Sequence, residues 1–167
     1  MAEQDPQLDL ATLAFIAGSA ANEVLLRRIR DAGHPDLRTS HGYVFQRLID
    51  GQPTVGELAA SLGVTQQAAS KAARELVDLG YVDRYADAAD GRVTRLVLTA
   101  KGTDAVEVAR RVRDGLQREL AATIDASDLA AARRALTALI DLVGEAESVR
   151  TRAVRPASIT LEGHSST

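Results

Sequence analysis

Apolar side chains recur at helical spacing from the start of the chain to a first break near residue 33. Between residues 8 and 29 they are three or four positions apart, which is the spacing of one face of an α-helix. These positions include Leu10, Leu13, Ala17, Ala20, Val24 and Leu25. Gly33 and Pro35 end the pattern. The sequence therefore predicts a long first helix that stops before these two residues.

A second, shorter helix of about ten residues follows the break. Thr39 or Ser40 can cap its start, because a short hydroxyl side chain accepts a hydrogen bond from a free amide of the first turn. Its apolar positions are Tyr43, Val44, Leu48 and Ile49. The turn at residues 50–53, which contains Gly and Pro, ends it.

The next segment has the pattern of two short helices joined by a tight turn. Thr54 and Glu57 can form a capping box at the start of a third helix. That helix is predicted to end at Gly63, and Thr65 can cap a fourth helix that closes at Gly80. The residues predicted to face inward on the fourth helix are Ala68, Ala69, Ala72, Ala73, Leu76 and Val77. Helices joined by so short a turn cross steeply, as in a helix-turn-helix.

A β-hairpin is predicted directly after the fourth helix. Residues 81–85 and 93–98 alternate apolar and polar side chains, and the polar stretch between them is rich in turn-forming residues. A hairpin at this place is typical of the wing of a winged helix-turn-helix. The wing can reach one groove of DNA while the second helix of the motif occupies the major groove.

Two more helices complete the predicted fold. Thr99 can cap a long fifth helix, and Asp125 or Ser127 can cap a sixth. The sixth has apolar positions in steps of three and four, the pattern of a seam against another helix. From about residue 150 the chain has little to bury, so we expect a disordered tail. The predicted fold class is mainly α with a small β-hairpin wing.

Composition favours packed helices in a cytoplasmic protein. Hydrophobic residues make up 46% of the chain and aromatic residues only 3%. The sequence has no cysteine, which excludes disulfides and thiol-based sensing. The N-terminal residues do not resemble a secretory signal, and no apolar run is expected to reach the ~20 residues of a membrane span. We expect no cofactor and no metal site.

Bulk charge does not indicate nucleic-acid binding, because the formal net charge is −3. The local pattern on the fourth helix does indicate it. The segment from Thr65 to Arg74 contains two basic residues and no acid, while Glu75 lies beyond it. The groups predicted to face base edges are Gln66, Gln67, Ser70 and Lys71. Thr65 and Arg74 are better placed for phosphates, alongside the amides of the helix N-terminus.

Three stretches carry a resemblance to a known family: residues 79–84 (LGYVDR), 90–92 (DGR) and 96–102 (LVLTAKG). Their order and spacing are similar to the strand, wing and following helix of the MarR family, the multiple antibiotic resistance type of regulators. The resemblance extends from the first helix through the sixth. It implies a homodimer in which the first, fifth and sixth helices pack together across a twofold axis.

The resemblance also implies roles for two wing residues and a class of ligand. By position, Arg92 enters the DNA minor groove and Asp90 orients it. The wing, residues 86–90, lacks the proline often found there. A small aromatic or phenolic molecule is expected between the dimerisation helices and the winged lobe. The bulky residues of the first two helices are Phe15, His41, Tyr43 and Phe45, but the ligand-binding residues stay unassigned.

These observations together predict a domain organisation and a function. Residues 1–33 and 103–149 are expected to form a helical dimerisation region, 37–102 a winged helix-turn-helix DNA-binding domain, and 150–167 a tail. The expected function is that of a transcriptional regulator, a repressor that binds an inverted-repeat operator in double-stranded DNA as a homodimer. A small-molecule ligand is expected to relieve repression.

Two other classes of function remain as alternatives. An enzyme has little support, because the sequence shows no nucleophile setting, phosphate-binding glycine loop or paired carboxylates. A winged helix can also serve as a protein-interaction module without specific DNA binding. The polar side chains of the fourth helix would then be an ordinary solvated face, and Arg92 a surface residue paired with Asp90.

Overall fold

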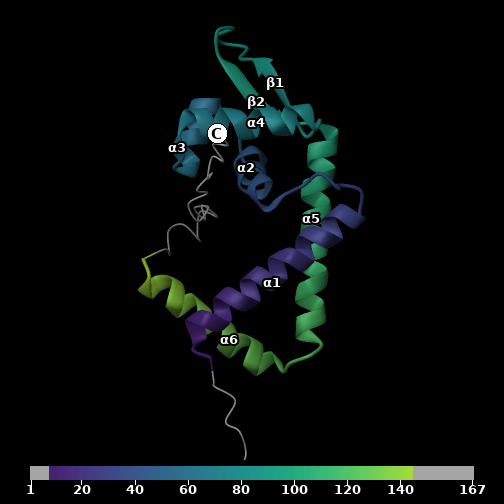
Figure 1. The fold of residues 1–167 in the computed structure, drawn as a ribbon, viewed down its shortest axis with the longest axis vertical. Coiled ribbons are helices and arrows are strands. Elements are labelled where there is room, and N and C mark those ends of the chain that lie inside the picture. Colours follow the sequence, from purple (N-terminus) through teal and green to yellow (C-terminus); the bar gives the residue numbers. More distant parts are fainter. Residues whose placement is uncertain (1–7, 145–167) are drawn as a thin grey trace, which may run out of the picture. The chain divides into compact units, whose positions relative to one another are not determined.

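The computed structural model of the 167-residue chain describes residues 8–144. The predicted tail at 150–167, and residues 145–149 of the predicted dimerisation region, lie outside the described residues. Within them the elements in chain order are α1 (Leu10–Asp31), α2 (Thr39–Ile49), α3 (Val55–Leu62), α4 (Gln66–Asp78), β1 (Val82–Ala86), β2 (Thr94–Leu98), α5 (Ala100–Ala121) and α6 (Ala126–Leu142) (Figure 1). The predicted fold class, mainly α with one small hairpin, is confirmed.

Contacts along the chain divide the described residues into two compact units. The helical unit consists of residues 8–39 and 100–144 and holds α1, α5 and α6. The winged unit consists of residues 40–99 and holds nearly all of α2, then α3, α4 and the two strands. Each unit is described by itself below.

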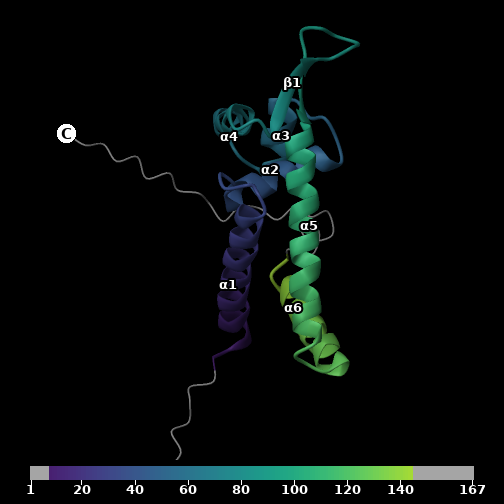
Figure 2. The same cartoon turned by 90° about the vertical axis from the view of Figure 1, so that its right-hand side faces the viewer.

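In the helical unit α1 lies beside α5, as both views show (Figures 1 and 2). The Arg28 guanidinium of α1 donates hydrogen bonds to both carboxylate oxygens of Glu119 on α5, at 2.7 and 2.8 Å. This arginine holds the pKa of the Glu119 carboxyl below its ordinary value. At the end of α1, the buried His34 ring places Nε2 3.1 Å from the carboxylate of Asp104. These side-chain pairs fix the register of the two helices.

Large apolar side chains of the helical unit are exposed. No residue of α1 or α6 within the described range is buried. The exposed set consists of Leu8, Leu10, Leu13, Phe15, Ile16, Leu120, Leu136, Leu142 and Val143. The side chains of Phe15 and Leu142 are 77% and 83% exposed. A monomer in water rarely leaves so much apolar surface uncovered, so these helices have the character of an interface.

One helix of the described range is long and apolar enough to span a membrane, contrary to the expectation from sequence. α1 has 22 residues, and none of them is buried. Helices of soluble proteins can have the same length and apolar composition, so α1 is weak evidence for a membrane segment. Arg28, inside α1, is bound to Glu119 of α5, which places the helix within a folded unit.

Side chains from α2, α3, α4 and the hairpin form the core of the winged unit. Its fully or almost fully buried apolar residues are Val44, Phe45, Leu48, Leu58, Ala59, Leu62, Ala69, Ala73, Leu76, Tyr81, Val82 and Leu96. The Phe45 and Tyr81 rings meet edge to face, with centroids 5.9 Å apart. Of the α4 residues predicted to face inward, Ala69, Ala73 and Leu76 are buried. The other three, Ala68, Ala72 and Val77, are only partly covered.

The hairpin forms one residue later than its predicted start, at β1 and β2. Its strands pair antiparallel, with Val82 opposite Leu98 and Ala86 opposite Thr94. A third short segment, which the sequence pattern did not indicate, joins β2 on its other side. There the Leu96 amide donates to the Pro53 carbonyl at 2.9 Å, and Thr54 bridges to Arg95. The turn before α3 is thereby attached to the wing.

Candidate nucleic-acid interface

α3 and α4 begin with the helix caps that the sequence predicts. The Thr54 hydroxyl accepts a hydrogen bond from the Glu57 amide at 3.2 Å, and the Glu57 carboxylate accepts one from the Thr54 amide at 2.7 Å. Gly63 then reverses the chain with φ of 65°, in the left-handed region that favours glycine. The Thr65 hydroxyl accepts a hydrogen bond from the Ala68 amide at 3.2 Å. Small residues at Ala59, Ala69 and Ala73 let α3 and α4 approach closely.

The exposed surface of α4 carries the residues predicted to meet DNA. Gln66, Gln67, Lys71 and Arg74 are exposed and Ser70 is half-buried. They lie within the first nine residues of the helix, where spacings of three and four bring side chains onto one surface. We call this set, together with the cap residue Thr65, the α4 surface. The first turn of α4 contains no acidic residue.

Acidic groups of α4 lie at its far end. Glu75 is half-buried, and its carboxylate lies 3.7 Å from Nε2 of the buried His41 on α2. Asp78 is the last residue of the helix and is exposed. Gly80 ends the turn with φ of 76°, and the Tyr81 amide donates back to the Leu76 carbonyl at 2.9 Å. The local charge of the α4 surface is therefore positive, although the whole chain is negative.

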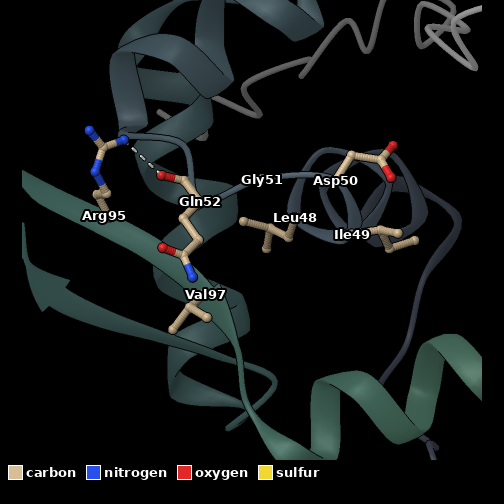
Figure 3. A pocket seen from close by; sticks show the side chains of 7 residues that line it. All are labelled: Leu48, Ile49, Asp50, Gly51, Gln52, Arg95 and Val97. Carbon is tan, nitrogen blue, oxygen red and sulfur yellow. Dashed lines mark hydrogen bonds between the residues drawn. The ribbon is translucent and has the colours of Figure 1, made fainter.

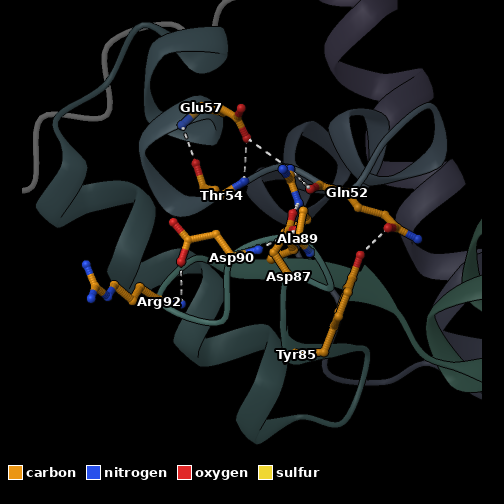
Figure 4. A network of polar contacts seen from close by, with 9 residues as sticks. Gln52, Thr54, Glu57, Tyr85, Asp87, Ala89, Asp90 and Arg92 are labelled. Carbon is orange, nitrogen blue, oxygen red and sulfur yellow. Dashed lines mark hydrogen bonds and ion pairs between the residues drawn. The ribbon is translucent and has the colours of Figure 1, made fainter.

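The wing loop is built by two aspartates (Figure 4). One carboxylate oxygen of Asp87 accepts hydrogen bonds from the Ala89 amide at 2.7 Å and the Asp90 amide at 3.4 Å. The Asp90 carboxylate accepts one from the Arg92 backbone amide at 3.0 Å. These bonds supply the local order that a proline would otherwise give.

The Arg92 side chain is exposed and extends away from the loop (Figure 4). Its guanidinium has no hydrogen-bond or ion-pair partner among residues 8–144. The Asp90 carboxylate holds the Arg92 backbone amide rather than its guanidinium, and the predicted orienting of Arg92 by Asp90 stays a prediction. A guanidinium without a protein partner is available to an anion such as a DNA phosphate or to the edge of a groove.

Arg95 on β2 is the centre of a polar network that the sequence did not predict, and Figure 4 labels its partners Gln52, Glu57 and Asp87. Its Nε donates to the Asp87 carboxylate, and its Nη1 donates to the Gln52 carbonyl at 3.0 Å. The Glu57 carboxylate lies 3.7 Å from the same Nη1. Hydrogen bonding by Arg95, then by the Ala89 amide, holds the pKa of the Asp87 carboxyl below its ordinary value. A signal was present in the sequence, since Asp87 in the predicted loop and Arg95 in the strand after it carry opposite charges.

A cavity of about 560 Å³ lies at the end of α2, beside β2 (Figure 3). Its lining residues are Leu48, Ile49, Asp50, Gly51, Gln52, Arg95 and Val97. Of the bulky residues of the first two helices, His41 and Phe45 are buried, Tyr43 is half-buried and Phe15 is exposed. We assign no ligand to this cavity, because the guanidinium of Arg95, its one basic lining group, is already bound to Gln52 and Asp87.

Comparisons with known proteins agree with this geometry. The family model described as MarR family matches residues 37–93. HTH-type transcriptional regulators of Mycobacterium bovis and Mycobacterium tuberculosis are each 31% identical over 96 residues, which cover 58% of this chain and 67% of theirs.

Solved structures share the fold at low identity. A mutant of S. aureus MepR has a TM-score of 0.68 at 18% identity and covers 81% of this chain and 99% of its own. Streptococcus pneumoniae FabT, solved in complex with DNA, has a TM-score of 0.65 at 17% identity and covers 81% and 96%. YusO of Bacillus subtilis has a TM-score of 0.64 at 20% identity and covers 78% and 92%. The family model and the two mycobacterial relatives, with the shared fold, show that the chain belongs to the MarR family of helix-turn-helix transcriptional regulators.

Proposed function

We propose that the protein binds an inverted-repeat operator in double-stranded DNA as a homodimer and represses transcription there. The observation that carries this proposal is the pairing of an acid-free α4 surface with an exposed wing arginine in one small unit. A polar, positive helix face next to a hairpin matches the shape and charge of two adjacent DNA grooves.

The residues of the α4 surface divide by chemistry into base-reading and phosphate-binding groups. Gln66 and Gln67 can each pair with N7 and N6 of adenine, Lys71 can donate to the acceptors of guanine, and Ser70 suits several bases. Thr65 and Arg74 are suited to phosphates, together with the free amides at the start of α4. This division predicts which substitutions change sequence preference and which only weaken binding.

The wing contributes a second contact. An arginine inserted into the minor groove reads its width and negative potential, with little dependence on base identity. The exposed Arg92 suits this role, and the bond from its amide to Asp90 supports the backbone from which it extends. Asp90 is therefore assigned to the DNA-binding site as a supporting residue rather than as a direct contact.

Homodimerisation is supported by the exposed apolar residues of α1 and α6. Their burial against a second copy would remove them from water, which is the main driving force of association. A twofold dimer presents two α4 surfaces with the same symmetry as an inverted repeat. Repression follows if that site overlaps a promoter.

Relief by a small aromatic or phenolic ligand completes the proposal. Such a ligand can act only if it binds one arrangement of the two α4 surfaces more tightly than the other. Its binding residues remain unassigned, and the family resemblance is the support for this part of the proposal.

The test is a salt-titrated binding assay with DNA flanking the coding region, in excess nonspecific competitor. The native chain should select a discrete fragment. Lys71→Ala and Arg74→Ala should weaken binding, and a lost phosphate contact should lower the slope of log affinity against log salt by about one. Arg111→Ala removes an equal charge from the exposed surface of α5 and should leave the slope unchanged. If no fragment is selected, the winged unit is better explained as a protein-interaction module.

A further inference from the structure

We infer that Arg95 is a positioning residue for the wing: it holds the hairpin in the orientation from which Arg92 reaches DNA. The inference rests on the proposed function, since it concerns how the Arg92 contact is made. Arg95 itself is not assigned to DNA, because its guanidinium already lies between two carboxylates of its own chain, those of Asp87 and Glu57.

Arg95 connects three parts of the winged unit that are far apart in the sequence. Its Nε bonds to Asp87 in the wing loop, and its Nη1 bonds to the carbonyl of Gln52 in the turn before α3. The same Nη1 lies 3.7 Å from the carboxylate of Glu57 in the first turn of α3. A guanidinium suits this task because its donors point in fixed, divergent directions within one plane.

The connection continues from Asp87 to Arg92 through the loop. Asp87 uses one carboxylate oxygen for Arg95 and the other for the amides of Ala89 and Asp90. The Asp90 carboxylate in turn accepts the Arg92 amide. The backbone from which the Arg92 side chain extends is therefore bonded, step by step, to Arg95. The Asp87 side chain is only 16% exposed, so water competes weakly for these bonds.

On the other side of Arg95, the connection reaches α3, the helix that packs against α4. Glu57 accepts the Thr54 amide within the capping box, and α3 packs directly against α4. The paired strands have two further bonds, one from the Tyr85 hydroxyl, opposite Arg95 in the register, to the Gln52 side chain and one from the Leu96 amide to the Pro53 carbonyl. Loss of Arg95 should thus free the loop of the wing while the strands stay attached.

The network strengthens DNA binding by ordering the wing loop before DNA is bound. A flexible loop must lose conformational entropy when Arg92 enters a groove, whereas a loop already ordered in the free protein does not. A charge at residue 95 that contacted phosphate would behave differently, since its loss would add to the loss of Arg92 and would lower the salt dependence.

The experiment is a double-mutant cycle on the selected DNA fragment with Arg92→Ala, Arg95→Met and the double variant. Arg95→Met should weaken binding at least about fivefold, the range of one specific contact. Adding Arg92→Ala to it should cost little more, because the contact is already lost. Hydroxyl-radical protection of the minor groove beside the α4 site should disappear in both single variants, while protection by α4 remains.

Three further variants separate positioning from folding and from charge. Asp87→Asn should reproduce Arg95→Met, and Arg95→Lys, which keeps a positive group between the carboxylates, should recover part of the affinity. Arg84→Met removes an exposed arginine from β1 of the same hairpin, and its effect should be additive with that of Arg92→Ala. Losses from Arg95→Met and Arg92→Ala that simply add, or an Arg95→Met protein that binds like the native one, would overturn the inference.

Hydrogen exchange of the DNA-free protein tests, without any operator, whether Arg95 orders the wing loop. Arg95→Met and Asp87→Asn should speed amide exchange at residues 89–93 by about tenfold or more, with α4 unchanged. Unchanged exchange in the wing would contradict the role of Arg95 even if DNA binding is confirmed. Failure of the native chain to select DNA would instead reject the proposed function, and the exchange result would still decide whether Arg95 orders the wing.

Discussion

Carboxylate side chains fix the turns of the winged unit residue by residue. Glu57 closes the start of α3, Asp87 closes the wing loop on Arg95, and Asp90 holds the Arg92 amide. The pKa values of the Glu57 and Asp87 carboxyl groups are both lowered. The backbone amide of Thr54 is the main cause for Glu57, and the Arg95 side chain is the main cause for Asp87.

These lowered pKa values predict how stability responds to acid. A carboxyl group whose pKa is lower in the folded state contributes stability that is fully present above its unfolded pKa, about 4. That contribution is lost as the pH falls through the folded value. Denaturant unfolding followed from pH 6 to pH 2.5 should therefore show a steeper loss for the native protein than for Asp87→Asn. Asp50→Asn, an exposed control, should keep the native slope. Identical slopes for all three would show that the Asp87–Arg95 pair contributes nothing to folding.

Local residue chemistry was largely predictable from sequence, whereas the Arg95 network was not. The capping box of Thr54 and Glu57, the Thr65 cap and the turn at Gly63 depend on neighbours within four residues, and all were predicted. The contacts of Arg95 depend on hairpin register and on a third segment joining β2. Such register comes from tertiary packing rather than from local spacing. The α4 and wing residues proposed for DNA are placed together in one unit, but their contacts with DNA remain predictions.

At the scale of elements, α1 and α6 are amphipathic helices with no buried residue in the described chain. The three- and four-residue steps of α6 predicted a seam with another helix, and its large apolar residues are exposed or half-buried. The spacing could reveal an interface but not its partner, because a seam within one chain and a seam between two chains have the same pattern. For a related reason the spacing did not predict the overall hydropathy of α1, since helical periodicity reports one face and not the whole helix.

Charged residues in the exposed apolar surface of α1 and α6 should prevent association of two copies of the chain. Leu13→Arg together with Leu136→Arg should shift the protein from dimer to monomer, because each change places a charge in the apolar surface. Sedimentation velocity measures the result, and operator affinity should fall along with the dimer. Gln117→Arg, at an exposed polar position of α5, is the control for added charge and should leave the dimer intact. A doubly substituted protein that stays fully dimeric would place the interface elsewhere.

At the scale of the whole molecule, the chain combines a winged unit with its own core and a helical unit that leaves its apolar surface uncovered. This combination explains, under the proposed function, how an acidic protein can bind DNA: the α4 surface carries Lys71 and Arg74 without an acid, and the wing, in which acidic and basic residues balance, offers the exposed Arg92. It also explains why the dimer is central to the proposed function, since two winged units double the contacts made on one operator.

Chemical footprinting of the selected DNA fragment is the most direct test of the proposed dimeric binding, because it maps major-groove guanines and minor-groove sugars at single-base resolution. We expect two protected half-sites related by a dyad and centred about one helical turn, or a whole number of turns, apart. Adjacent minor-groove protections should be lost in Arg92→Ala, and major-groove protections should be weakened in Lys71→Ala. Diffuse protection that is the same for a folded native protein and both variants would contradict the account.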